Sequence, residues 1–197
     1  MDDSLNKIAW PVATERLSLR RLESNDLEAT WRYRQLPEVT RWITSAPGSL
    51  DEYRKYFLEE GRIARDVAVE VEAVGGKVLI GTVMLKVQDG WGQSEIAEKA
   101  RQAEAEIGWS FDPAYGGKGY ATEAVRTVLE LSFGALGLRR VTAECFAANE
   151  PSWRLMERLG MRRESYARQS GLHRSGEWMD GMTYALLAEE WGELVTA

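Results

Sequence analysis

The feature that most constrains this chain is a pattern of strand, glycine-rich turn and helix between residues 105 and 136. A short apolar run ends at Asp112, three glycines fall within residues 116–119, and apolar positions at helical spacing follow. The first turn of such a helix presents unpaired backbone N–H groups at the positive end of its dipole. Glycines let an anion approach this backbone closely, and Lys118 adds a positive charge. The pattern therefore predicts a site for a phosphate or diphosphate.

The glycine spacing does not match the two common nucleotide motifs. A P-loop requires a glycine where this chain has Asp112, and a Ser or Thr where Gly119 follows Lys118. A dinucleotide-binding motif requires a third Gly or Ala where this chain has Thr122, and no βαβ repeat surrounds it. The alternative that uses no ligand is a glycine-rich loop that only turns the chain.

Composition bounds the class of protein. The chain has 197 residues, 44% hydrophobic and 28% charged, which is typical of one soluble globular domain over residues 1–197. The acidic N-terminus has no apolar core and no apolar run is long enough for a membrane span, so we expect a cytoplasmic protein without a membrane partner. One cysteine and one histidine exclude an internal disulfide and a zinc site of sulfur and nitrogen ligands, so no metal is expected.

The net charge of −6 argues against nucleic acid as the partner. An acidic surface suits a cationic acceptor such as an amine, although it serves solubility equally well. A polyanionic cofactor would require locally basic side chains, for which Lys118, Arg126 and Arg154 are the candidates.

The glycine-rich stretch resembles motif A of the GNAT family of N-acetyltransferases, Gln/Arg-x-x-Gly-x-Gly/Ala. Gly119-Tyr120-Ala121 matches its second half, whereas Gly116 stands where Gln or Arg is usual. The run GKGYATEA is particularly similar to the branch that acetylates the N-termini of ribosomal proteins. The similarity continues, in the order of that branch, through residues 14–17, 145–152, 158–161, 176–180 and 184–187. It thus covers nearly the whole chain.

The resemblance implies an α/β acyltransferase fold with a mixed central sheet of about seven strands, flanking helices and a splayed central strand pair. The sequence pattern agrees with strands at about 12–22, 66–74, 77–87, 104–111, 139–146, 161–169 and 177–187. Helices are expected after Ser24-Asn25-Asp26, after Ser49, over 117–136 and after Asn149. Residues 1–10 are expected to be a loose lead-in, and residues 89–103 an excursion that is a solvated loop, a lid or a contact with a partner subunit.

The resemblance further implies acetyl-CoA as co-substrate. Its diphosphate would bind the loop and first turn formed by Gly116, Gly117, Lys118, Gly119, Tyr120, Ala121 and Thr122. Its pantetheine arm would pair with the backbone of Ile107 and Trp109, like an added strand. Asn149 and Ser152 match the Asn-x-x-Ser pattern that the branch uses for contacts to CoA.

Direct attack of an amine on the thioester requires a group that takes the amine proton and one that protonates the departing thiolate. Glu106 occupies the position of the base in the resemblance, with Glu104 and Glu177 as alternatives. Ser152 is the candidate acid and Asn149 its orienting partner, although both residues also suit the first turn of a helix. Cys145 alternates with inward-facing residues and is expected to be a structural thiol, and His173 is expected at the surface of a polar loop.

The acceptor amine is less constrained. Trp31, Trp42 and Glu177 are candidates for substrate binding, and ordinary packing accounts for the tryptophans equally well. The acceptor is a protein N-terminal α-amine or a small-molecule amine, and a homodimer is left open. Two other functions remain: an acyl-CoA sensor without turnover, which the Gly116 departure keeps open, and a nucleotide-binding domain.

Overall fold

The computed structural model describes residues 4–59 and 61–196. The chain divides into two compact units, the first formed by residues 1–85 and 109–128 and the second by residues 86–108 and 129–197. Strand β4, strand β5 and helix α4 each contribute residues to both units. No described helix is both long enough and apolar enough to cross a bilayer.

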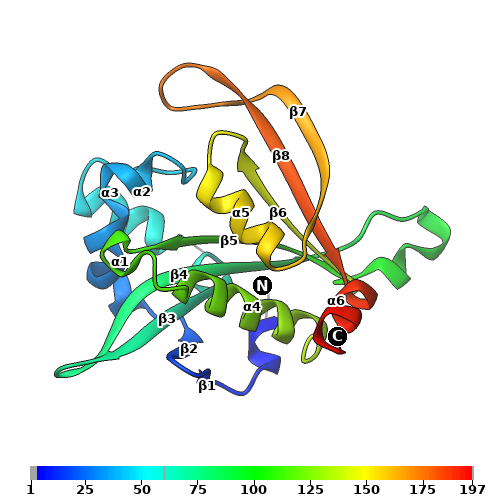
Figure 1. Ribbon diagram of the computed structural model, residues 1–197, viewed down its shortest axis with the longest axis horizontal. Helices are drawn as coiled ribbons and strands as arrows, with labels where there is room; N and C mark the ends of the chain where they lie inside the picture. Colours follow the sequence, from blue (N-terminus) through cyan, green and yellow to red (C-terminus); the bar gives the residue numbers. More distant parts are fainter. Residues whose placement is uncertain (1–3, 60, 197) are drawn as a thin grey trace. The chain divides into compact units, whose positions relative to one another are not determined.

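The first unit is built on antiparallel strands in the order β1-β2-β3-β4, with three short helices α1, α2 and α3 close together in the chain (Figure 1). Its strands are β1 (Val12–Ala13), β2 (Leu17–Arg21), β3 (Asp66–Ala73) and β4 (Gly76–Gln88). Its helices are η1 (Ser4–Lys7), η2 (Ser24–Asp26), α1 (Leu27–Arg34), α2 (Pro37–Thr40), α3 (Leu50–Phe57), η3 (Ile63–Arg65), η5 (Pro113–Tyr115) and the start of α4 (Tyr120–Phe133). A hydrophobic cluster that includes Leu27, Tyr33, Tyr53, Phe57 and Ala68 forms its core.

Two expectations for this unit are wrong. Residues 12–22 do not form one strand but a hairpin, in which Val12 pairs with Leu19 and Ala13 with Ser18. The alternation of apolar and polar residues is the same in a hairpin and in a single strand, and residues 14–16 contain no Gly or Pro to mark the turn. Residues 4–8 are not a loose lead-in, because η1 forms there and the side chains of Leu5 and Ile8 are buried. Residues 1–3 lie outside the described part of the chain.

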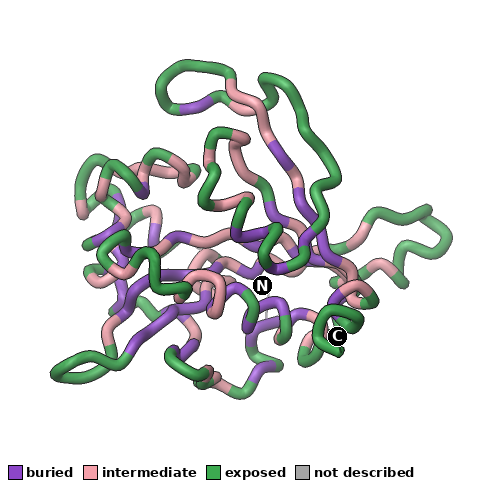
Figure 2. The backbone as a smooth tube through the Cα atoms, in the orientation of Figure 1, coloured by how far each residue is buried: buried purple, intermediate pink, exposed green. Residues whose placement is uncertain are grey.

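The second unit pairs β5 (Glu104–Phe111) in parallel with β6 (Arg140–Phe146), and β6 and β7 (Arg162–Leu172) each antiparallel with β8 (Trp178–Leu187). Its helices are η4 (Ser94–Ala100), the end of α4, α5 (Glu150–Arg158) and α6 (Ala188–Thr196). All but one residue of β7 are exposed, as Figure 2 shows along this strand. The 89–103 excursion contains η4, and Trp91 within it is almost fully exposed.

The parallel pair in the second unit separates early. β5 pairs with β6 at Glu104↔Arg140, Ala105↔Val141 and Glu106↔Thr142, and the pairing stops there. β6 continues to Phe146, paired throughout with β8. This is the predicted splayed pair, and the predicted α/β fold with a mixed set of strands is confirmed. The described strands number eight instead of about seven because residues 12–22 form two.

Candidate functional site

The glycine loop leads directly into α4. Gly117 and Gly119 have φ angles of +73° and +81°, which residues with a side chain rarely adopt. The carbonyl oxygen of Gly119 accepts the first hydrogen bond of the helix, from the Glu123 amide at 3.0 Å. Among residues 4–59 and 61–196, no backbone acceptor is found for the amide hydrogens of Tyr120, Ala121 and Thr122. The loop is exposed, so this turn offers free N–H groups to an anion from solvent.

The basic candidates Lys118 and Arg154 differ in their surroundings. The Lys118 ammonium lies 5.7 Å from the centre of the Tyr115 ring and is exposed. Arg154, on α5, forms an ion pair with Glu150 one turn earlier. Gly116 has ordinary φ and ψ angles, and its amide donates to the Pro113 carbonyl at 2.9 Å, so its backbone closes the η5 turn.

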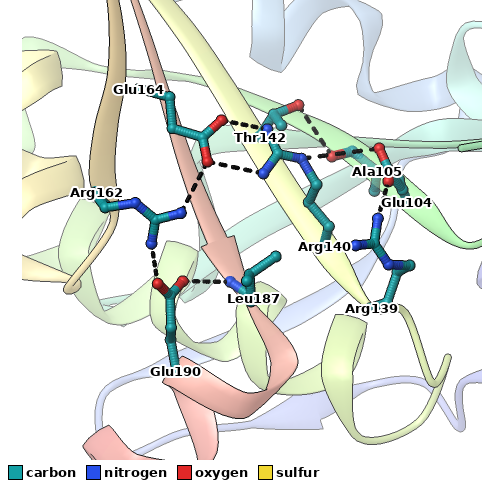
Figure 3. Close-up of polar contacts among 9 residues, drawn as sticks. All are labelled: Glu104, Ala105, Arg139, Arg140, Thr142, Arg162, Glu164, Leu187 and Glu190. Atoms are coloured by element: carbon teal, nitrogen blue, oxygen red, sulfur yellow. Dashed lines mark hydrogen bonds and ion pairs between the residues drawn. The ribbon is translucent and has the colours of Figure 1, made fainter. Parts of the chain in front are cut away.

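The candidate base Glu106 lies at the last paired position of β5. The Lys86 ammonium is 3.6 Å from its carboxylate, and both side chains are partly open to solvent. Glu104, the first alternative, is instead part of a charged network that links β5, β6, β7 and α6 (Figure 3). It bonds to Arg139 and Arg140, and its side chain is only 18% exposed. Glu104 thus has the structural contacts that Glu106 lacks.

Asn149 and Ser152 lie at the start of α5 in the second unit. Asn149 occupies the N-cap position, but its side chain makes no capping hydrogen bond. Its ψ angle of 69° departs from the extended geometry with which a cap residue reaches back to the helix. Helix capping therefore does not explain why an asparagine side chain stands at position 149.

The Ser152 hydroxyl lies beside the Cys145 thiol near the end of β6, where it acts on the pKa of the thiol as a hydrogen-bond partner. Burial raises the pKa of Cys145 to about 11, and the bond from Ser152 opposes this shift. Cys145 is half-buried and stays a neutral thiol near pH 7. The expectation that it is not a nucleophile agrees with this environment.

The residues proposed for acceptor binding make packing contacts. Trp31 stacks on Tyr53 with 5.2 Å between ring centres, and Trp42 lies under the Arg41 guanidinium at 4.6 Å. The exposed Glu177 carboxylate accepts from Ser175 Oγ at 3.5 Å. A cavity behind α1 and α3, lined by Arg34, Tyr53 and Asp66 among others, has a volume of about 10 Å³. It has room for about one water molecule and is too small for an amine substrate.

His173 is not the surface residue that the sequence suggested. Its side chain is 8% exposed, its Nδ1 lies 2.9 Å from Ser175 Oγ, and its ring meets the Phe146 ring edge-on at 5.5 Å. The turn between β7 and β8 folds over it, because the His173 amide donates to the Glu177 carbonyl. The polar residues around His173 suggested an open loop, but they close a compact turn.

Sequence reasoning also missed residues that hold the glycine loop. Arg16 donates to the Lys118 carbonyl at 2.8 Å and to the Glu123 carboxylate at 2.7 Å. The strand expected over residues 12–22 contains Arg16, and nothing in its pattern points to Glu123. The signal available in the sequence was the joint presence of residues 14–17 and 117–124 in one resemblance.

Comparison with known proteins agrees with this architecture. The family model described as Acetyltransferase (GNAT) domain matches residues 16–162. The uncharacterized N-acetyltransferase YnaD of Bacillus subtilis is 32% identical over 180 residues, covering 91% of this chain and 98% of that protein. The putative ribosomal N-acetyltransferase YdaF of the same species is 30% identical over 183 residues, covering 90% and 94%. The crystal structure of a GNAT-family acetyltransferase from Bacillus anthracis superposes with a TM-score of 0.74 at 32% identity, covering 91% and 99%.

A family model that spans most of the chain, full-length relatives at this identity and the splayed parallel pair all agree. The chain therefore belongs to the GNAT family of acetyltransferases and is an acyltransferase.

Proposed function

We propose that the protein transfers the acetyl group of acetyl-CoA to an amine, by direct attack of the amine on the thioester. The observation that carries this proposal is the start of α4, where two glycines with positive φ precede three amide hydrogens that have no backbone acceptor in the described part of the chain. A helix start of this kind stabilises a diphosphate, and CoA carries one. The exposed Lys118 adds charge at the same loop.

The opening of β5 away from β6 supports a place for the pantetheine arm. The backbone of Ile107 and Trp109 lies beyond the last pair, Glu106↔Thr142. Amide and carbonyl groups on a strand edge that has lost its neighbour are available to an extended ligand, which pairs as an added strand would. The amide groups of pantetheine are of the right kind for this pairing.

For the chemistry, Glu106 is the proposed base. Its only ion-pair partner among the described residues is Lys86, and the carboxylate is 38% exposed, so water or an acceptor amine has access to it. Ser152 is the proposed donor to the departing thiolate, with Asn149 as its neighbour at the start of α5. The Asn149 side chain makes no capping bond, and the Ser152 hydroxyl acts on the neighbouring Cys145 thiol.

For the acceptor, we propose an α-amine at a protein N-terminus, with small amines as the second class. An α-amine has a pKa of about 7.7–8.0 against about 10.4 for lysine, so a single exposed carboxylate is a sufficient base. The 30% identity to a protein named a putative ribosomal N-acetyltransferase supports the same choice.

The test is an acetyl-CoA turnover assay that follows thiol release against a panel of N-terminal peptides, lysine peptides and small amines. We expect turnover with α-amines to exceed that with lysine side chains at pH 7. Replacement of Gly117 or Gly119 by Val should weaken CoA binding, because each needs a positive φ. CoA binding without thiol release from any acceptor would favour a sensor instead. Unchanged CoA affinity in both glycine variants would refute the proposed diphosphate site.

A further inference from the structure

The tip of the β1–β2 hairpin touches the start of α4, within the first unit. Arg16 donates three hydrogen bonds to this region. Its Nη1 donates to the Lys118 carbonyl at 2.8 Å. Its Nε donates to Glu123 Oε2 at 2.7 Å, and its backbone amide to Glu123 Oε1 at 3.0 Å. The guanidinium also lies 4.9 Å from the centre of the Tyr120 ring. Segments about a hundred residues apart in the chain are thereby fastened together.

Thr14 completes this contact. Its hydroxyl donates to Glu123 Oε1 at 2.6 Å and accepts from the Leu17 amide at 2.9 Å, which also shapes the hairpin turn. Burial alone would raise the pKa of Glu123, but the bonds from Thr14 and Arg16 outweigh it and hold that pKa below its usual value. The carboxylate is therefore charged at neutral pH and is a strong partner for the guanidinium.

The bond to Lys118 has a geometric consequence for the loop. A trans peptide is planar, so its C=O and N–H point in opposite directions. Because the Lys118 carbonyl faces Arg16, the Gly119 amide hydrogen of the same peptide points away from Arg16. Arg16 Nη2 also stands 3.4 Å from the place where a Cβ of Gly119 would lie, so the guanidinium sits directly against this glycine.

We propose that Arg16 is a positioning residue for the cofactor site: it sets the orientation of the Lys118–Gly119 peptide and so aims the loop's amide at the diphosphate. Its guanidinium lies on the carbonyl side of this peptide, and its charge is balanced by Glu123, whose Oε2 is 2.6 Å from Arg16 Nη2. A planar guanidinium reaches the carbonyl and the carboxylate at once, which a lysine ammonium does not. This inference rests on the proposed binding of acetyl-CoA.

The experiment measures the affinities of wild type, Arg16→Ala, Arg16→Lys and Thr14→Val for CoA by calorimetry and for pantetheine by NMR titration. Pantetheine lacks the diphosphate, so it reports on the rest of the site. Glu15→Gln is the matched control, because Glu15 lies in the same turn, is exposed and also changes the charge. Melting temperatures confirm that each variant is folded.

We expect Arg16→Ala to weaken CoA binding roughly tenfold, the size of one lost charged hydrogen bond, while pantetheine affinity stays unchanged. Arg16→Lys and Thr14→Val should weaken CoA binding less, and Glu15→Gln not at all. A double variant Arg16→Ala/Glu123→Ala should be little worse than Arg16→Ala alone, because both remove one linkage.

Other outcomes separate the inference from the function on which it rests. If wild type binds CoA and Arg16→Ala binds it equally well, the positioning role is wrong and the proposed function stands. Equal weakening for CoA and pantetheine would mean a general structural role and would also overturn the inference. If wild type does not bind CoA, the proposed function fails, and the inference fails with it. Should Arg16→Ala not fold, Arg16→Lys and Thr14→Val decide by the same comparison.

Discussion

The Glu106 carboxylate lies 3.6 Å from the Lys86 ammonium, at the position where β5 stops pairing with β6. A carboxylate at a strand end can also be a purely structural group, when an arginine holds it in a bidentate pair. The partner is instead a lysine whose side chain is 44% exposed, and an ion pair of this kind contributes little to stability. Glu106 is therefore free to serve chemistry at small expense to the fold.

Replacing Glu106 by Gln should lower kcat with α-amine peptides by about 10²-fold, the lower range for loss of a general base. CoA affinity should be unchanged, because the proposed contacts to CoA do not use this side chain. Glu104→Gln is the comparison: we expect it to reduce stability more than turnover, since Glu104 bonds to Arg139 and Arg140. If both variants kept full kcat, the base would have to be sought elsewhere.

The bond between Ser152 and Cys145 can be followed through the thiol. Ser152 lowers a thiol pKa that burial raises to about 11, so Ser152→Ala should move that pKa further upward. The midpoint of the pH profile for alkylation by iodoacetamide should shift to higher pH. Ser170→Ala, whose hydroxyl bonds to the Ala167 carbonyl, removes a similar group elsewhere and should leave the midpoint in place. A downward shift in Ser152→Ala would contradict the bond.

The buried carboxyl group of Asp66 leads us to expect an unusual pH dependence of the free energy of unfolding. Burial raises its pKa from 3.8 to about 6, despite Arg34, Arg62 and Arg65. Between these values the native state binds the proton that the unfolded state releases, so the free energy of unfolding falls as the pH rises. Asp66→Asn should flatten the profile of this free energy, measured by urea unfolding from pH 4 to pH 7. Parallel profiles for the two proteins would show that Asp66 does not carry the dependence.

Gly81 lies against the Phe111 ring. A Cβ at Gly81 would stand 2.7 Å from Phe111 Cγ, and every real carbon contact is longer. Gly81→Ala should therefore reduce the free energy of unfolding by about 1–3 kcal/mol, the usual range for overpacking. In a Phe111→Leu background, Gly81→Ala should reduce the free energy of unfolding by less than it does in wild type. A double-variant cycle measured by urea unfolding makes this comparison. Additive losses would mean that the ring moves aside without strain.

The sequence predicted elements whose signals are local. Gly75-Gly76 marks the β3–β4 turn, and the glycine cluster marks the start of α4. The β1–β2 hairpin was missed because Thr14, Glu15 and Arg16 are not typical turn residues, and their turn depends on Glu123 far along the chain. The ion-pair partners of Glu104 and Glu106 were not predictable either, because they depend on how neighbouring strands align with β5. Candidate residues followed from resemblance, but their contacts followed only from tertiary structure.

The uncapped start of α5 suggests a route for engineering. The Asn149 side chain does not form the capping hydrogen bond, which typically stabilises a helix by about 1 kcal/mol. Asn is nevertheless among the residues that form this bond best. An extended backbone at Asn149 would let its side chain form that bond. Thermostabilised versions that restore the cap should therefore be screened for lost turnover as well as for higher melting temperature.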